Sequence, residues 1–144
     1  MQQFVHVKKI NHSFFLINII IWHNRTHMIY QLRSDLLELH KQLVDISKYE
    51  YQKIHGPIAG PAALFKLLVE HSLFQWLRSL SETIVAIDEA LETNPPATQE
   101  AIIKMIHRRL FPEKPNEFSQ KLIDYMNEKQ EIRNAVQAIK AHFN

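Results

Sequence analysis

The sequence predicts an all-α protein, an antiparallel helical bundle of about five helices, three long and two short. Apolar residues recur at intervals of three and four through most of residues 28–144, which is the period of an amphipathic helix. No part of this range shows the alternation of a strand, and both glycines of the chain fall in one stretch, residues 55–61. This stretch is therefore the principal break in the helical pattern.

The composition narrows the class of protein. A chain of 144 residues with 46% hydrophobic and 22% charged residues is typical of one globular domain. It has no cysteine, which excludes a disulfide, a thiolate nucleophile and a cysteine-ligated metal, and fits a cytoplasmic location. The net charge of +2 is too small to indicate nucleic-acid binding, so no nucleic-acid partner is expected.

Residues 1–27 differ from the rest. They contain no acidic residue, and their apolar run, Phe14 to Trp22, is interrupted only by Asn18. The run is too short for a transmembrane helix, and no small-residue cleavage site of a signal peptide follows it. We favour a translation start at Met28, with a weak signal or anchor segment as the second interpretation. We therefore expect 1–27 to be a leader outside the domain and 28–144 to be a single helical-bundle domain; a membrane contact is expected only if residues 10–22 are genuine.

The first long helix is predicted at residues 29–54. Its apolar positions form a heptad stripe: Ile29, Leu32, Leu36, Leu39, Leu43 and Ile46. The dipeptide Gly56-Pro57 predicts its end, because glycine accepts the left-handed conformation that follows many helices and proline cannot continue one.

A short second helix is predicted from Pro61, which suits the first turn because its missing N–H has no helical partner there. Its core face is Leu64, Leu67, Leu68 and His71. Ser72 and Gln75 match a capping box, so we expect a break at His71-Ser72 and one continuous third helix over residues 73–91.

The C-terminal third of the chain predicts one further short helix and one long segment. Thr98 is a plausible N-cap for the short helix, which should run to about Leu110. Residues 116–142 keep one apolar register, but the polar run 127–131 interrupts it. The pattern fits either a single helix or two helices with a break in that run.

Residues 36–91 carry a resemblance, through Leu39-His40, His55-Gly56-Pro57-Ile58, Pro61, Trp76-Leu77-Arg78, Leu80-Ser81 and Ile87-Asp88-Glu89. This part of the chain resembles a family of small, uncharacterised bacterial all-helical proteins, for which no activity is known. The resemblance implies a bacterial origin, a helical bundle and a start close to Met28. It implies nothing about chemistry.

Known catalytic and metal-binding patterns are missing from the sequence. A di-iron bundle needs Glu-x-x-His on facing helices, and neither Glu38 with His40 nor Glu70 with His71 has that spacing. The serines lack the glycines of a nucleophile elbow, and no glycine-rich phosphate loop is present. We therefore predict no catalytic residue, no metal ligand and no cofactor.

One set of polar residues stands beside the apolar stripes: His40, His55, Arg78, Ser81 and Asp88. The structural interpretation is a hydrogen-bond network that docks the Gly-Pro stretch on the third helix, with Asp88 close to His55. The functional interpretation is a ligand site. The structural interpretation is the more economical.

Phe74 and Trp76 are candidate interface residues. Two positions apart on one helix, they cannot both face the same core, so one should face a partner or a neighbouring helix. The leading hypothesis is a non-enzymatic protein that acts through protein contacts, as a homodimer. The alternative is a small-molecule-binding or enzymatic module built on His40, His55, Arg78 and Asp88; a third possibility is peripheral membrane association through residues 10–22.

Overall fold

The computed structural model describes the backbone of residues 12–144 and their side chains apart from those of 12–15, 22, 25 and 26. The all-α prediction is confirmed, since this part of the chain contains helices and no strand. Within residues 12–144 there are seven helices rather than about five: α1 (His12–His55), α2 (Pro61–Glu70), α3 (Ser72–Gln75), α4 (Arg78–Glu92), α5 (Gln99–Leu110), α6 (Glu117–Glu128) and α7 (Gln130–Ala141).

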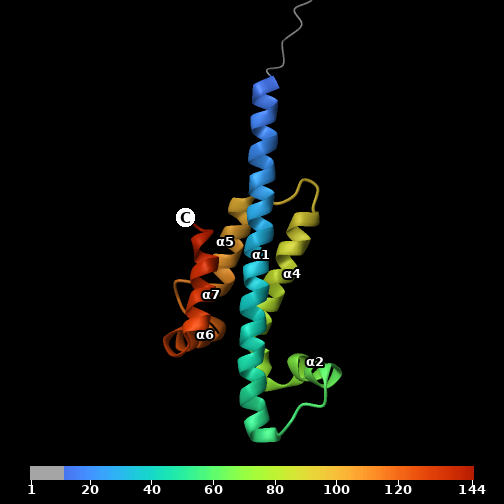
Figure 1. Ribbon diagram of the computed structural model, residues 1–144, viewed down its shortest axis with the longest axis vertical. Coiled ribbons are helices and arrows are strands. Elements are labelled where there is room, and N and C mark those ends of the chain that lie inside the picture. The colour runs from blue at the N-terminus through green and yellow to red at the C-terminus, as the bar shows by residue number, and fades with distance from the viewer. Residues whose placement is uncertain (1–11) are drawn as a thin grey trace, which may run out of the picture.

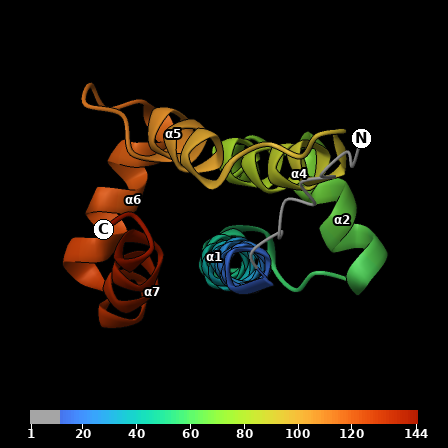
Figure 2. The same ribbon diagram turned by 90° about the horizontal axis from the view of Figure 1, so that it is seen from above.

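The long helix α1 is the axis of the molecule (Figure 1). Helices α4, α5 and α7 lie alongside its lower two-thirds and run alternately up, down and up relative to its downward course (Figures 1 and 2). The short helix α2 stands off to the side near the C-terminal end of α1. Helix α6 crosses below α7 and links it to α5.

The core forms along the heptad stripe of α1. Leu32, Leu36, Leu39 and Leu43 are all 0% exposed, and Ile29 is 3% exposed. Facing them are the buried side chains of the later helices: Leu80, Ile84, Ile87, Ile102, Ile106, Leu110, Phe118, Leu122, Ile132, Val136 and Ile139. The periodicity of the sequence therefore identified the interior correctly.

Helix α1 begins at His12, well before the predicted start at residue 29. The backbone does not change at Met28, but the side-chain environment does. Leu16, Ile17 and Ile20 are more than half exposed, whereas Met28 is the first of the described side chains that packs against the core. The described residues before Met28 thus continue the helix without joining the interior.

Gly56 ends α1 as predicted. Its φ is +82°, and its N–H donates to the carbonyl of Gln52 over 3.0 Å. Gly60 has a φ of +96° and precedes Pro61, the first residue of α2. These are conformations that residues with a Cβ rarely adopt, so the two glycines fix the path of the connection.

The break before Ser72 is confirmed, but its cap is His71 rather than Ser72. His71 is extended, and its Nδ1 accepts from the N–H of Leu73 over 3.2 Å. The continuous helix predicted over 73–91 is wrong, because the chain is interrupted again at Trp76 and Leu77, between α3 and α4.

This second interruption removes the premise that Phe74 and Trp76 lie on one continuous helix, and the neighbouring-helix alternative describes Trp76. Both are buried, at 1% and 4% exposure, because the helix does not continue through them with regular spacing. Trp76 stacks on Phe118 and Tyr125, with ring centroids 5.8 Å from its own in each case. It therefore joins α6 to the rest of the core, and neither residue offers an exposed interface.

The C-terminal elements follow the predicted boundaries. The Oγ1 of Thr98 accepts from the N–H of Ala101, so Thr98 is the N-cap of α5. Asn116 and Ser119 form a capping box at the start of α6. The chain then breaks at Lys129, which is extended, so the segment 116–142 forms two helices, α6 and α7.

Candidate functional site

Three members of the predicted polar cluster lie in one hollow. His40, Arg78 and Ser81 line a cavity of about 330 Å³ between α1, α2 and the start of α4. The rest of its wall is apolar: Phe65, Leu68, Val69, Phe74 and Leu77. The hollow is thus a hydrophobic groove with a few polar groups, which is the composition of many binding sites.

The polar groups of this hollow are engaged with the backbone. The guanidinium of Arg78 donates to the carbonyl of Val69 over 3.4 Å, across the α2–α4 junction. The hydroxyl of Ser81 lies 3.3 Å from the carbonyl of Leu77 and 3.2 Å from that of Arg78. Burial lowers the pKa of the His40 imidazole, which favours its neutral form. Within the described residues no hydrogen bond joins His40 to Ser81, whose hydroxyl is directed to the backbone carbonyls instead.

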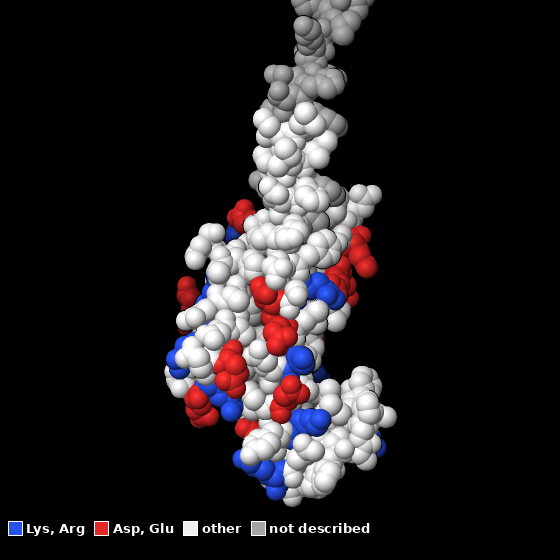
Figure 3. Space-filling model, in the orientation of Figure 1, with Lys and Arg blue, Asp and Glu red and all other residues white. Residues whose placement is uncertain are grey.

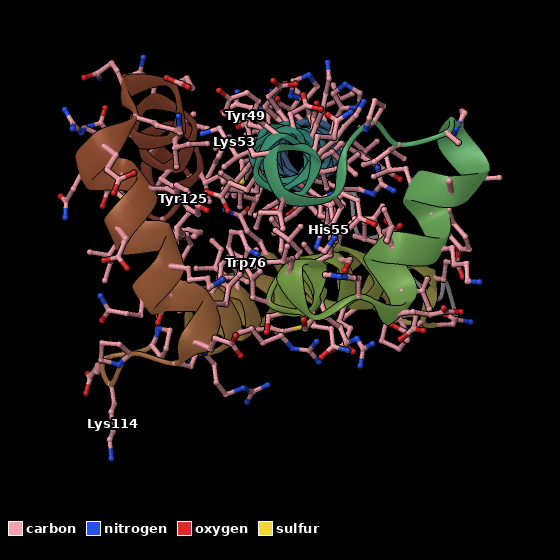
Figure 4. All side chains as sticks on the ribbon, turned by 90° about the horizontal axis from the view of Figure 1, so that it is seen from below. Tyr49, Lys53, His55, Trp76, Lys114 and Tyr125 are labelled. Atoms are coloured by element: carbon pink, nitrogen blue, oxygen red, sulfur yellow. The ribbon has the colours of Figure 1, made fainter. Side chains whose placement is uncertain are left out.

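His55 lies in a different group, with Tyr51 and His71. The ring centroids of Tyr51 and His55 are 4.5 Å apart, and those of His55 and His71 are 5.6 Å apart. Tyr51 and His71 border a second hollow, of about 540 Å³, whose other walls are Pro57, Ile58, Ala59, Ala63, Lys66, Leu67 and Glu70. Figure 4 shows His55 at the end of α1, on the side that faces the start of α4.

Asp88 is not near the Gly-Pro stretch, contrary to the prediction. Its carboxylate is bound by the guanidinium of Arg33 on α1, with Nη2 to Oδ2 at 2.8 Å and a further bond from Nε to Oδ1. The pairing links α4 to the middle of α1, away from the cavity of His40. Arg33 was not among the predicted residues, because a single sequence does not show which positions of two helices lie opposite one another.

Helix α2 separates the first two hollows and supplies residues to both. Eight of the ten residues of α2, PAALFKLLVE, are apolar or proline. All ten are described, and none of them is buried. Leu64, Leu67 and Leu68 are half-buried, whereas Phe65 is 68% and Val69 49% exposed. The predicted core face therefore packs only partly, and the adjacent apolar side chains Phe65 and Val69 are open to solvent. Figure 3 shows α2 standing apart from the rest of the surface.

A third hollow, of about 500 Å³, lies between α1, α6 and α7. Figure 4 shows Tyr49, Lys53 and Tyr125 around it. The hydroxyl of Tyr125 donates to Oε1 of Glu50 over 2.8 Å. The pKa of this tyrosine is raised, mainly because the side chain is removed from water and secondly because of the hydrogen bond to Glu50. The other walls are mostly polar: Gln42, Asp45, Ile46, Glu128, Lys129 and Glu131. Mixed charge around an open hollow is typical of a solvated helix junction.

The described residues contain neither a metal-binding cluster nor a helix that could cross a membrane. Within residues 12–144, His, Asp and Glu side chains form no group of three or more with the geometry of a metal site. No helix in the described range is both long enough and apolar enough to cross a bilayer.

No protein family, curated protein or solved structure matches this chain. The resemblance of residues 36–91 to small bacterial helical proteins therefore stays an expectation, and the candidate site rests on the geometry alone. In that geometry the exposed apolar side chains of α2 depart from the rule that apolar helix faces are covered.

Proposed function

We propose that this chain is a non-enzymatic helical-bundle protein that acts through protein contacts, and that it forms a homodimer through the exposed face of α2. The observation that carries the proposal is the exposure of Phe65 and Val69 on a helix that contributes no buried side chain within the described part of the chain. The two residues are four positions apart, so they form one continuous stripe.

Burial of this stripe favours association. Apolar surface removed from water contributes about 25 cal/mol per Å², and aromatic side chains such as Phe65 are frequent anchors at the centre of protein interfaces. The cavity beside α2 continues the apolar surface of the stripe, because Phe65, Leu68 and Val69 all line it. A partner helix seated against Phe65 would therefore also contact the half-buried Leu68.

The charges on α2 favour a second copy as the partner. Its only charged residues are Lys66 and Glu70, one of each sign on the same flank. In an antiparallel pair centred on Leu68, these two positions are equally distant from the centre, so Lys66 of each copy faces Glu70 of the other. A two-fold contact requires this kind of self-complementarity.

Sedimentation equilibrium of the full chain tests the dimer. We expect a dimer at micromolar concentration, and a monomer for Phe65→Glu with an unchanged circular dichroism spectrum. The matched control is Val85→Glu on α4, which introduces the same charge at a side chain that is 54% exposed and should leave the dimer intact. A monomeric full chain, or a dimer that persists in Phe65→Glu, would contradict the proposal.

A charge exchange tests the antiparallel arrangement. Lys66→Glu or Glu70→Lys alone places like charges opposite one another and should weaken the dimer. The double variant Lys66→Glu/Glu70→Lys restores opposite charges and should recover most of the affinity. If the double variant is as weak as the single ones, α2 binds a different surface.

The alternative function, a ligand-binding module, is supported by the shared cavity of His40 and Arg78. Its cation and imidazole suit a small anion. Titration of the full chain with inorganic phosphate, followed by NMR shifts of the histidine rings, tests it, with Arg78→Gln as the variant that should abolish the shifts. Shifts that are absent, or equal in Arg78→Gln, remove this alternative.

A further inference from the structure

The N-terminal part of α1 projects beyond the other helices (Figure 1). The exposed fractions of five large aliphatic side chains there lie between 41% and 58%: Leu16, Ile17, Ile19, Ile20 and Ile21. At 100° per residue these positions are spread around much of the helix rather than along one stripe. A helix surface that is apolar on most sides is stable in water only when another apolar phase covers it.

The charges around this projection have one sign. The first acidic residue of the chain is Asp35, whereas Lys8 and Lys9 precede the apolar run and Arg25 follows it. In Figure 3 the described part of the projection is white, without a charged side chain on the face shown. An apolar segment flanked only by cations is complementary to a lipid bilayer, which has an apolar interior and can carry anionic headgroups.

A second copy of α1 is a poorer match for the projection. Continued toward the N-terminus, the heptad stripe that begins at Ile29 falls on Arg25, Trp22, Asn18 and Phe15. Two of these four positions are polar, so the apolar seam that a coiled coil requires does not extend into the projection. The cations at its two ends would also repel those of a parallel copy.

We propose that residues 14–22 form a membrane-surface anchor, which inserts into the interfacial region of a bilayer that carries anionic lipid. The run from Phe14 to Trp22 is less than half of the roughly 20 apolar residues that span a bilayer. It suits one leaflet, and the sequence supplies a tryptophan, a residue type favoured at the headgroup region, and three flanking cations, Lys8, Lys9 and Arg25, whose charge attracts anionic lipid. The contact is independent of α2, because the two surfaces lie at opposite ends of α1 (Figure 1).

Flotation with lipid vesicles tests the anchor. The full chain should bind vesicles of phosphatidylcholine with 30% phosphatidylglycerol, and it should bind pure phosphatidylcholine vesicles much more weakly. Ile17→Asp/Ile20→Asp should lower the partition coefficient by roughly tenfold or more, because charged residues are strongly unfavourable in an apolar phase. Lys8→Glu/Lys9→Glu should reduce binding to the anionic vesicles only.

Controls separate the anchor from general adhesion. Ile54→Asp, at a side chain that is 70% exposed near the other end of α1, should bind vesicles like the unmodified chain. Phe65→Glu should also bind normally, so failure of the proposed α2 dimer and failure of the anchor give different results. Absence of vesicle binding by the full chain, or equal binding by Ile17→Asp/Ile20→Asp, would overturn the inference.

Fluorescence gives a second readout. Trp76 is 4% exposed and buried between other rings, so lipid should affect its emission little. Insertion of the anchor predicts a blue shift on addition of the anionic vesicles, and Trp22→Phe should remove it. A blue shift that persists in Trp22→Phe would contradict insertion at this segment. The inference would also fail if Ile17→Asp/Ile20→Asp abolished oligomerisation but left vesicle binding unchanged, because the projection would then be a contact between copies of the chain.

Discussion

Arg33 and Asp88 join α1 to α4 through a two-point ion pair. Nη2 of Arg33 donates to Oδ2 of Asp88 over 2.8 Å, and Nε donates to Oδ1 of the same carboxylate. The hydrogen bond from Arg33 is the main cause that lowers the pKa of Asp88 from its ordinary value. The side chains are 31% and 40% exposed, so solvent screens much of the attraction.

Replacement of Asp88 tests the strength of this pair. Asp88→Asn should lower the free energy of unfolding at pH 7 by up to about 1 kcal/mol. A bidentate ion pair stabilises a protein only modestly more than the median solvent-exposed ion pair does. Urea denaturation measures the change. Glu92→Ala, an exposed position on the last turn of α4, is the control and should be neutral.

The same pair predicts a pH dependence. The pKa of Asp88 is lower in the folded chain than in the unfolded chain, so the unfolded state binds the proton first as the pH falls. The stabilisation is complete above about pH 4, the unfolded value, and is lost below it as the pH passes through the folded pKa. The Asp88→Asn chain should therefore lose less stability than the unmodified chain between pH 5 and pH 2.5; equal losses would show that the ion pair is not stabilising.

The buried imidazole of His40 should make the stability of the fold depend on pH in a higher range than Asp88 does. Burial lowers the pKa of its imidazole, so the unfolded chain takes up this proton more readily than the folded chain. Stability due to neutral His40 is present above about pH 6.5 and declines as the pH falls through the folded pKa. In His40→Gln the difference in free energy of unfolding between pH 7.5 and pH 5.5 should shrink. An unchanged difference in His40→Gln would contradict this explanation.

Substitution of Gly56 should destabilise the fold through the backbone conformation at this position, without a steric clash. A Cβ at this position would meet no atom within 4 Å, so any destabilisation comes from the φ of +82°. Gly56→Ala should lower the free energy of unfolding by about 1 kcal/mol or more, and Gly56→Asn by less, because asparagine tolerates the left-handed region better. Thermal melts that rank alanine at or above asparagine would contradict this explanation.

Replacement of Ser47 by alanine should stabilise the fold. It is 2% exposed, and its hydroxyl has no hydrogen-bond partner among the described residues. Ser47→Ala removes a buried unpaired polar group from the middle of α1 and should raise the free energy of unfolding by about 1 kcal/mol. Ser119→Ala is the matched control, because the hydroxyl of Ser119 donates and accepts within the α6 capping box. It should be destabilising.

The helical pattern was predictable wherever one apolar stripe faced one core. The stripe from Ile29 to Leu43 is buried as its spacing indicated, and Gly56, Pro61 and Thr98 mark the boundaries that their backbone chemistry requires. The break at Trp76 was not predictable, because neither glycine nor proline marks it. There the packing of Trp76 against Phe118 and Tyr125 outweighs the local preference to continue a helix.

The candidate site was predictable in part. His40, Arg78 and Ser81 share a hollow, as residues beside facing stripes can, whereas Asp88 pairs with Arg33 and His55 packs on Tyr51. Spacing along one helix fixes which residues share a face, but it does not fix the rotation and offset between two helices. For the same reason the open face of α2 could not be distinguished in advance from a buried one.

The continuity of α1 has a mechanical consequence. Its 44 residues correspond to a rod of about 66 Å, with the aliphatic projection at one end and the connection to α2 at the other. Helices α4, α5 and α7 lie against the lower two-thirds of this rod (Figure 1). Whatever is held at one end is therefore kept at a nearly constant distance from whatever is held at the other, and the left-handed conformations of Gly56 and Gly60 set the angle at which α2 leaves the rod.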